Sequence, residues 1–191
     1  MGNKYAVGHL TALLTISIWG TTFISTKILL IDFTPVEILF FRFIMGFAAL
    51  IIVYPRRMDV KEGKHELYFA IAGICGVTMY YLLENIALTY TMASNVGVIS
   101  ALAPFFTAMI AYFFLREEKL RLHFFLGFAV AMAGVYLITF SGASNLQINP
   151  IGDLLAVAAT IVWAVYSVLM RKISRFGYNT LQTTRKIFFY G

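Results

Sequence analysis

The chain has 191 residues, of which 60% are hydrophobic and 13% are charged, and its mean hydropathy is +0.81. Soluble domains carry about 25% charged residues, so this composition excludes a water-soluble fold, and its apolar blocks exclude a disordered chain. The net charge of +6 does not indicate nucleic-acid binding, because Lys and Arg gather in short connectors between the apolar blocks. We therefore expect an all-α integral membrane protein, a polytopic helix bundle surrounded by the lipid bilayer.

Apolar stretches of about 17 residues or more are long enough to cross the hydrocarbon core as helices. Six stretches qualify, in chain order Ala6 to Ile31, Pro35 to Tyr54, Leu67 to Tyr90, Asn95 to Leu115, His123 to Phe140 and Leu154 to Met170. The single cysteine, Cys75, lies inside the third stretch, so the sequence predicts neither a disulfide framework nor a cysteine metal pair. No cofactor is expected.

Lys and Arg alternate between the two sides of the predicted bundle. They precede the first span and follow the second, fourth and sixth, whereas the connectors after the first, third and fifth spans contain none. Because positive residues are retained in the cytoplasm, this predicts a multi-pass protein of the plasma or inner membrane with a cytoplasmic N-terminus. The basic residues are Lys4; Arg56, Arg57, Lys61 and Lys64; Arg116, Lys119 and Arg121; and Arg171, Lys172 and Arg175.

A weak internal repeat relates the first span to the sixth. When residues 7–27 are laid over 151–171, four positions are identical, among them Trp19 over Trp163. Five spans separate the two copies, and an odd number inverts the second copy in the membrane, as in many secondary transporters. The predicted units are residues 1–148, a first five-helix repeat, and residues 149–191, the truncated start of a second, inverted repeat.

Several motifs give the chain a resemblance to the drug/metabolite transporter superfamily, EamA type. They are Trp19-Gly20 with Lys27, Pro35 with Arg42, Ala87-Leu88 leading to Ala93-Ser94-Asn95, and the stretch from Pro104 through Leu115-Arg116-Glu117-Glu118 to Gly127 and Gly134-Val135. The resemblance implies ten helices in two inverted five-helix repeats around a central cavity. It also implies export of amino acids or other small metabolites.

With this resemblance, the sequence predicts a permease that exports or exchanges small organic metabolites, such as amino-acid-like or amine compounds, by alternating access. Helices eight to ten and most of helix seven of such a plan are missing, so we expect transport to require the missing C-terminal half or a second chain. The alternative is a half-size or inactive membrane scaffold subunit that works with a partner chain. No nucleic-acid partner is expected.

Aromatic and hydroxyl side chains mark one face of the first span. Trp19 lies in mid-span, where an indole N–H usually needs a partner, and Thr22 lies on the same stripe. Trp163, the repeat mate of Trp19, is close in sequence to Tyr166. These residues predict aromatic walls of a shared cavity, which suit amphipathic organic substrates. The alternatives are that the threonines bond to carbonyls of their own helix and that the tryptophans fill the core.

Three charged residues within the spans are the clearest functional signal, because each costs about 2.5 to 3.5 kcal/mol at mid-membrane. Lys27, Arg42 and Glu84 lie about 6, 10 and 9 Å below the predicted outer ends of their helices, depths that permit pairing. Glu84 shares a small and polar face with Tyr80. The open alternatives are a buried ion pair that joins the second and third spans, or a role in substrate binding or proton coupling.

Small residues follow one face of the fourth span and part of the fifth. The fourth-span face holds Gly97, Ser100, Ala101, Pro104, Thr107, Ala108 and Ala111. Ser100 and Pro104 are cavity candidates, because a proline at mid-span is tolerated where a cavity satisfies the freed carbonyl; a packing seam is the alternative. In the fifth span, Gly127, Val130, Ala131 and Gly134 predict helix packing, with dimerisation as the alternative.

Enzyme chemistry is not predicted. The Glu117-Glu118 pair lies at a span end, and His9, His65 and His123 lie at span ends or in a connector, so no intramembrane nucleophile, base or metal group is assembled. The sequence therefore predicts no catalytic residue and no metal-ligating residue.

Overall fold

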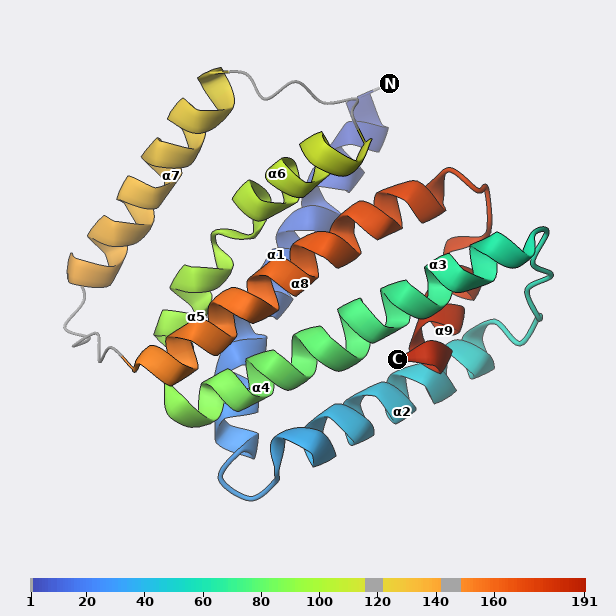
Figure 1. Cartoon of the computed structure of the whole chain (residues 1–191), viewed down its shortest axis with the longest axis horizontal. Helices are drawn as coiled ribbons and strands as arrows, with labels where there is room; N and C mark the ends of the chain where they lie inside the picture. The colour runs from blue at the N-terminus through green and yellow to red at the C-terminus, as the bar shows by residue number, and fades with distance from the viewer. Residues whose placement is uncertain (1, 116–121, 142–148) are drawn as a thin grey trace.

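The computed structural model describes residues 2–115, 122–141 and 149–191, and every regular element in these ranges is a helix. The helices pack side by side in a bundle that the chain crosses back and forth (Figure 1). The predicted polytopic all-α fold is thereby confirmed. In chain order the elements are α1 (Gly2–Leu29), α2 (Pro35–Val53), α3 (Gly63–Gly73), the π-helical segment η1 (Ile74–Met79), α4 (Tyr80–Tyr90), α5 (Ala93–Ser100), α6 (Ala103–Leu115), α7 (Leu122–Ser141), α8 (Pro150–Ser174) and α9 (Thr180–Tyr190).

Five stretches of the described residues are long and apolar enough to cross a membrane, and they agree within a few residues with five of the six predicted spans. They are Ala6–Leu29, Pro35–Val53, Gly63–Tyr90, Ala93–Leu115 and Pro150–Ser174. The predicted span from His123 to Phe140 is helical as well, in α7, although its described apolar stretch, Leu122–Val135, is shorter. Large apolar side chains are exposed along these helices, as a lipid-facing surface requires.

Local sequence signals mark the residues at which α2 and α8 begin. Thr34 caps α2 in a capping box with Glu37, and Pro35 occupies the first turn, where its missing N–H costs nothing. Asn149 caps α8 in the same way, accepting a hydrogen bond from the Gly152 N–H. These caps fix where α2 and α8 enter the bundle.

The fourth predicted span is interrupted, which corrects the expectation of one continuous helix from Asn95 to Leu115. α5 ends at Ser100 and α6 begins at Ala103. Pro104 has no N–H to donate to the carbonyl four residues earlier, so the regular ladder cannot continue through this turn. The chain resumes with hydrogen bonds from the Phe105 and Phe106 N–H groups to the Leu102 carbonyl.

α8 is the central helix and packs against α3, η1, α4, α5 and α6. One buried cluster joins α3, η1, α8 and α9 around Phe69 and Ile173. A second joins α4, α5 and α8 around Leu88 and Ala156. In Figure 1, α1 and α8 run in opposite directions, as an inverted relation requires; the division into two repeats itself stays a prediction.

The small-residue faces pack less than predicted. Ala111 of α6 is buried, but Pro104 is exposed. In α7, Gly127, Val130 and Ala131 are exposed, so the expected packing of this face is wrong within the part of the chain that the structure describes. The reason is that α7 lies at the edge of the bundle in Figure 1, where no described helix covers that face.

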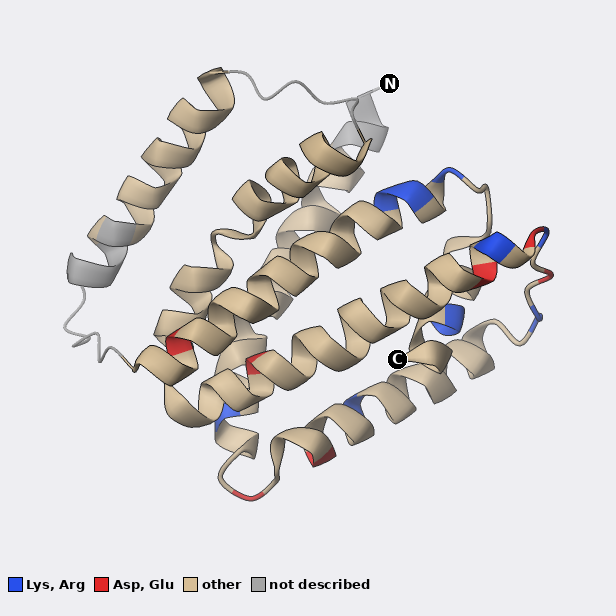
Figure 2. Ribbon diagram, in the orientation of Figure 1, with Lys and Arg blue, Asp and Glu red and all other residues tan. Residues whose placement is uncertain are grey.

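Most charged residues lie near the ends of the helices (Figure 2). Lys and Arg occupy the connector between α2 and α3 and the end of α8, whereas the turn between α1 and α2 contains Asp32 and the first turn of α8 contains Asp153. Several sequence predictions fall on residues outside the described ranges: Arg116, Glu117, Glu118, Lys119, Arg121 and the connector at 142–148.

Candidate functional site

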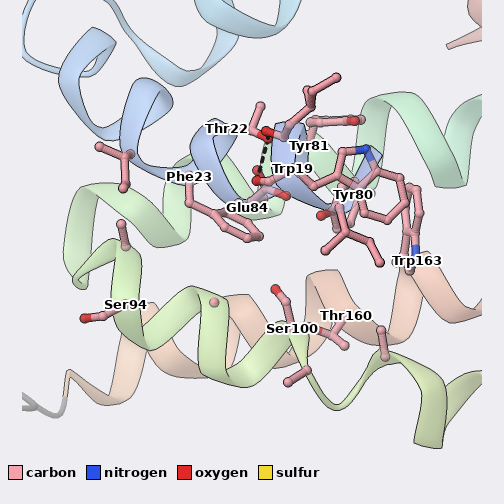
Figure 3. A pocket seen from close by; sticks show the side chains of 18 residues that line it. Trp19, Thr22, Phe23, Tyr80, Tyr81, Glu84, Ser94, Ser100, Thr160 and Trp163 are labelled. Atoms are coloured by element: carbon pink, nitrogen blue, oxygen red, sulfur yellow. Dashed lines mark hydrogen bonds between the residues drawn. The ribbon is translucent and has the colours of Figure 1, made fainter. Parts of the chain in front are cut away.

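A cavity of about 880 Å³ opens between α1, α4, α5, the start of α6 and α8. In Figure 3, Trp19, Phe23, Tyr80 and Glu84 lie on one side of it, and Ser100 and Thr160 face them from the other. Six of the ten predicted site residues line it: Trp19, Thr22, Tyr80, Glu84, Ser100 and Trp163. The remaining lining residues are Ile16, Ile18, Gly20, Phe23, Ile24, Tyr81, Ala93, Ser94, Gly97, Ala101, Ala103 and Thr160.

Aromatic rings form one wall of the cavity. Trp19 and Trp163, the pair related by the internal repeat, meet edge to face with ring centroids 5.5 Å apart. The Tyr80 ring lies 4.8 Å from Trp163 and 4.8 Å from Tyr81. Such edge-to-face and tilted contacts are the preferred geometry for ring pairs. The rings of Trp19, Tyr80, Tyr81 and Trp163 therefore form one aromatic cluster that lines the cavity.

The π-helical segment η1 sets the position of this wall. It lies directly before Tyr80, and single π-helical turns within α-helices occur frequently at functional sites. Within η1, Gly76 faces the Tyr166 ring so closely that a Cβ there would lie 2.3 Å from the ring. The glycine thus allows α8 to approach, and Tyr166 packs behind Trp163 at 5.2 Å. Tyr166 supports the wall but does not line the cavity.

Glu84 is the one charged side chain among the described residues that line the cavity. It is only 3% exposed, in agreement with the prediction that its helix face points into the protein. The Tyr80 hydroxyl lies beside the carboxylate, and Arg42 is close enough to interact with it electrostatically. A buried carboxylate surrounded by aromatic rings is a favourable site for a positive charge.

Arg42 takes a different partner from the one predicted. Its Nη2 donates to the Thr26 Oγ1 at 2.7 Å, and its guanidinium lies 5.3 Å from the centroid of the Tyr81 ring. Among the described residues, Arg42 and Glu84 form no ion pair within 4.0 Å, so the expected ion pair between the second and third spans is not present. The Arg42 Nη1 is buried and has no hydrogen-bond partner in the part of the chain that the structure describes.

Lys27 has a structural partner instead of a place in the cavity. Its Nζ donates to the backbone carbonyl of Leu88 and, at 2.9 Å, to that of Thr91. These carbonyls belong to the last turn and the cap of α4, where a cation complements the unpaired carbonyls and the helix dipole. Lys27 was predicted as a cavity residue, but its ammonium group caps α4 and it does not line the cavity.

Hydroxyl groups near the cavity are mostly occupied by their own helices. The Thr22 Oγ1 donates to the Trp19 carbonyl at 2.7 Å, as Figure 3 shows, and Thr160 donates to Ala156 at 2.8 Å. Thr22 thus follows the alternative given for the threonines, a hydrogen bond to a carbonyl of its own helix. Thr26 differs, since its hydroxyl accepts a hydrogen bond from Arg42.

The sequence analysis placed Pro104 in the cavity and missed several lining residues. Pro104 is exposed on α6 and does not line it, because the helix break turns this residue away. Tyr81 and Phe23 line the cavity without having been predicted. Tyr81 follows Tyr80 directly, and helix periodicity alone does not place both on one face; the π-helical turn has no clear sequence signal.

Comparison with known proteins gives one family. The sequence profile described as the EamA-like transporter family matches residues 6–140. An uncharacterized transporter of Archaeoglobus fulgidus is 29% identical over 91% of this chain and 61% of its own length. One of Clostridium kluyveri is 30% identical over 86% of this chain and 56% of its own. The uncharacterized inner membrane transporter YhbE of Escherichia coli is 26% identical over 92% and 57%.

No solved structure gives a significant match. The chain spans less than two thirds of the length of these relatives. The family profile covers most of the chain and includes the α1, α4 and α5 walls of the cavity. The chain is a multi-pass membrane protein that belongs to the EamA-like transporter family.

Proposed function

We propose that the whole protein is a permease for small organic cations, such as amines or amino-acid-like compounds with an ammonium group. The observation that carries the proposal is Glu84, a buried carboxylate that faces an aromatic cavity. A cation at Glu84 would neutralise a charge that is costly inside the membrane. The rings of Trp19, Tyr80 and Trp163 would add cation–π attraction of about 0.5 to 2 kcal/mol each.

The size and lining of the cavity support a small organic ligand. Its volume of about 880 Å³ falls in the range of ligand pockets, about 300 to 1,000 Å³. Apolar and aromatic side chains make up most of its surface, with a few polar groups such as Ser94 and Ser100. An inorganic ion would not fill this space, whereas a metabolite with one ammonium group and an apolar body would.

We further propose that the protein works by alternating access between two inverted repeats, residues 1–148 and the unit that starts at 149. The contact between Trp19 and Trp163 supports this, because the two repeat-related residues would meet at the interface between the moving units. Transport would need the sequence that relatives have beyond this chain, or a second chain, since the chain spans 61% of one relative and 56% of another.

The proposed orientation places the N-terminus in the cytoplasm of a plasma or inner membrane. The connector between α2 and α3 and the end of α8 carry Lys and Arg, and the opposite end carries Asp32 and Asp153. Cytoplasmic connectors are the ones enriched in Lys and Arg. In this orientation, Glu84 would lie nearer the outer surface of the membrane than the cytoplasmic surface.

A binding experiment tests the proposal on the chain itself. The two tryptophans of the sequence, Trp19 and Trp163, both line the cavity, so intrinsic fluorescence reports on its occupancy. We expect choline, whose charge does not titrate, to change this fluorescence saturably in detergent. The uncharged isostere 3,3-dimethyl-1-butanol should bind at least tenfold more weakly, because it lacks the charge that Glu84 attracts.

Matched variants separate the carboxylate from a general loss of negative charge. Glu84→Gln should weaken choline binding at least tenfold, while Asp32→Asn, which removes one exposed carboxylate at the same end of the bundle, should leave it unchanged. Equal binding of choline and its isostere, or wild-type affinity in Glu84→Gln, would overturn the proposal. Transport is then tested by measuring uptake and efflux of the compounds that bind, with the full-length gene product in liposomes.

A further inference from the structure

Arg42 and Glu84 are oppositely charged neighbours that do not touch. Glu84 borders the cavity, and the Arg42 guanidinium lies over the ring of Tyr81, which precedes Glu84 by three residues on α4 and lines the same cavity. We infer that Arg42 is an internal cation that competes with the substrate's ammonium group for Glu84. This inference rests on the proposed function and adds to it a residue that sets affinity without lining the cavity.

The structure shows Arg42 held away from the carboxylate by two contacts. Its Nη2 donates to the fully buried Thr26 hydroxyl of α1, and its guanidinium lies over the Tyr81 ring. Neither contact neutralises the positive charge. In a membrane-embedded site, both contacts are weaker than a guanidinium–carboxylate pair, which gains two charge-assisted hydrogen bonds.

The Arg42 guanidinium also keeps unused hydrogen-bonding capacity. Its Nη1 is buried without a partner among the described residues, and a buried donor that is left unsatisfied is costly. The Glu84 carboxylate lies beside the Tyr80 hydroxyl and borders the cavity. A movement of the guanidinium onto the carboxylate would therefore satisfy this donor.

These observations define two positions of one side chain. When an ammonium group occupies Glu84, Arg42 stays with Thr26 and Tyr81. When the ammonium group leaves, the guanidinium moves onto the carboxylate, so that the membrane interior does not hold an unpaired negative charge. No bond is made or broken and no proton is transferred; the carboxylate exchanges one cation for another. Tyr81 contacts Arg42 and also lines the cavity, so it connects the position of Arg42 with the cavity.

Two substitutions should shift choline affinity in opposite directions. Arg42→Gln removes the competitor and should tighten choline binding at least fivefold. Thr26→Val removes the hydroxyl that holds the guanidinium away, at similar volume and with no change in charge, and should weaken choline binding at least fivefold. Arg57→Gln, an exposed arginine at the other end of the bundle, controls for net charge and should bind like the wild type.

The measurement is the choline titration of tryptophan fluorescence at pH 8 and pH 9, with a thermal melt of each variant. The alkaline conditions keep protonation of the carboxylate from masking a gain in affinity. If Arg42 acts in packing alone, both variants should have a lower melting temperature and weaker choline binding. Competition predicts instead that the choline affinity of the folded protein rises in Arg42→Gln and falls in Thr26→Val.

The outcomes distinguish this inference from the proposed function. If Glu84→Gln loses choline but Arg42→Gln and Thr26→Val both leave the affinity unchanged, or both weaken it, the competition is wrong and the cation site stands. If the wild type and Glu84→Gln bind choline alike, the cation site and the competition fail together. Opposite shifts in the two variants support both.

Discussion

Gly76 of η1 lies against the Tyr166 ring of α8, and alanine at this position tests how the cavity wall is supported. A Cβ there would lie 2.3 Å from Cδ2 and 2.6 Å from Cγ of the Tyr166 ring. Ordinary van der Waals contact starts at 3.4 Å, so the ring would have to retreat by roughly 1 Å. Because Cγ is the ring atom bonded to Cβ, flipping the ring does not relieve the clash, and α8 itself must move.

The expected magnitude combines two opposing effects. Overpacking of a filled site costs about 1 to 3 kcal/mol. Alanine is favoured over glycine within a helix by about 1 kcal/mol. We therefore expect Gly76→Ala to lower the free energy of unfolding by up to about 2 kcal/mol, which changes the unfolding equilibrium by a factor of up to roughly 30.

Gly127→Ala in α7 is the matched control, because no atom of the described residues lies within 4 Å of where a Cβ at that glycine would be. The same chemical change there should stabilise the protein by up to about 1 kcal/mol. The two alanine variants should thus differ by about 1 to 3 kcal/mol in thermal melts in detergent. Gly76→Ala should also change the tryptophan emission, since Tyr166 packs on Trp163 at 5.2 Å.

The reasoning is refuted if Gly76→Ala and Gly127→Ala have equal stability and both keep the wild-type emission spectrum. That result would mean that α8 does not press on η1 at this position. If Gly76→Ala is destabilised but keeps the wild-type tryptophan emission spectrum, the strain does not fall on the Tyr166 and Trp163 rings.

Two more substitutions test the remaining assignments. Lys27→Met removes the ammonium group that bonds to the Leu88 and Thr91 carbonyls, so we expect about 2 kcal/mol lower stability in a thermal melt, and unchanged choline affinity per folded molecule; lost affinity at wild-type stability would contradict the capping role. In a Cys75→Ala background, Ser144→Cys should react with an impermeant thiol reagent in intact cells, because the connector after the fifth span has no Lys or Arg. Labelling only after the cells are opened would reverse the proposed topology.

The sequence alone was enough to predict the helices that cross the membrane and the ends that carry positive charge. The reason is that both depend on properties counted along the chain: about 20 apolar residues for a span, and Lys and Arg in connectors. Burial of Glu84 was also predictable, since it shares a helix face with Gly76 and Ala87, and a charged group on the lipid side is too costly.

The partners of Lys27 and Arg42 could be learned only from the tertiary structure. Lys27 and Arg42 lie at similar predicted depths, yet Lys27 caps α4 and Arg42 bonds to Thr26. Depth along a helix fixes one coordinate only. Which group a long side chain reaches depends on how the helices are rotated about their axes and how closely they pack, and hydropathy does not contain that information.

The shape of the cavity wall was likewise decided by local departures from the regular helix. The π-helical segment η1 precedes Tyr80 and Tyr81, and the break after Ser100 turns Pro104 away from the cavity. A face calculated at 100° per residue assumes an unbroken α-helix, so it loses phase at such points. The sequence by itself determined which helices form and which ends carry the positive charge, whereas only the packed bundle decided which side chains meet around Glu84.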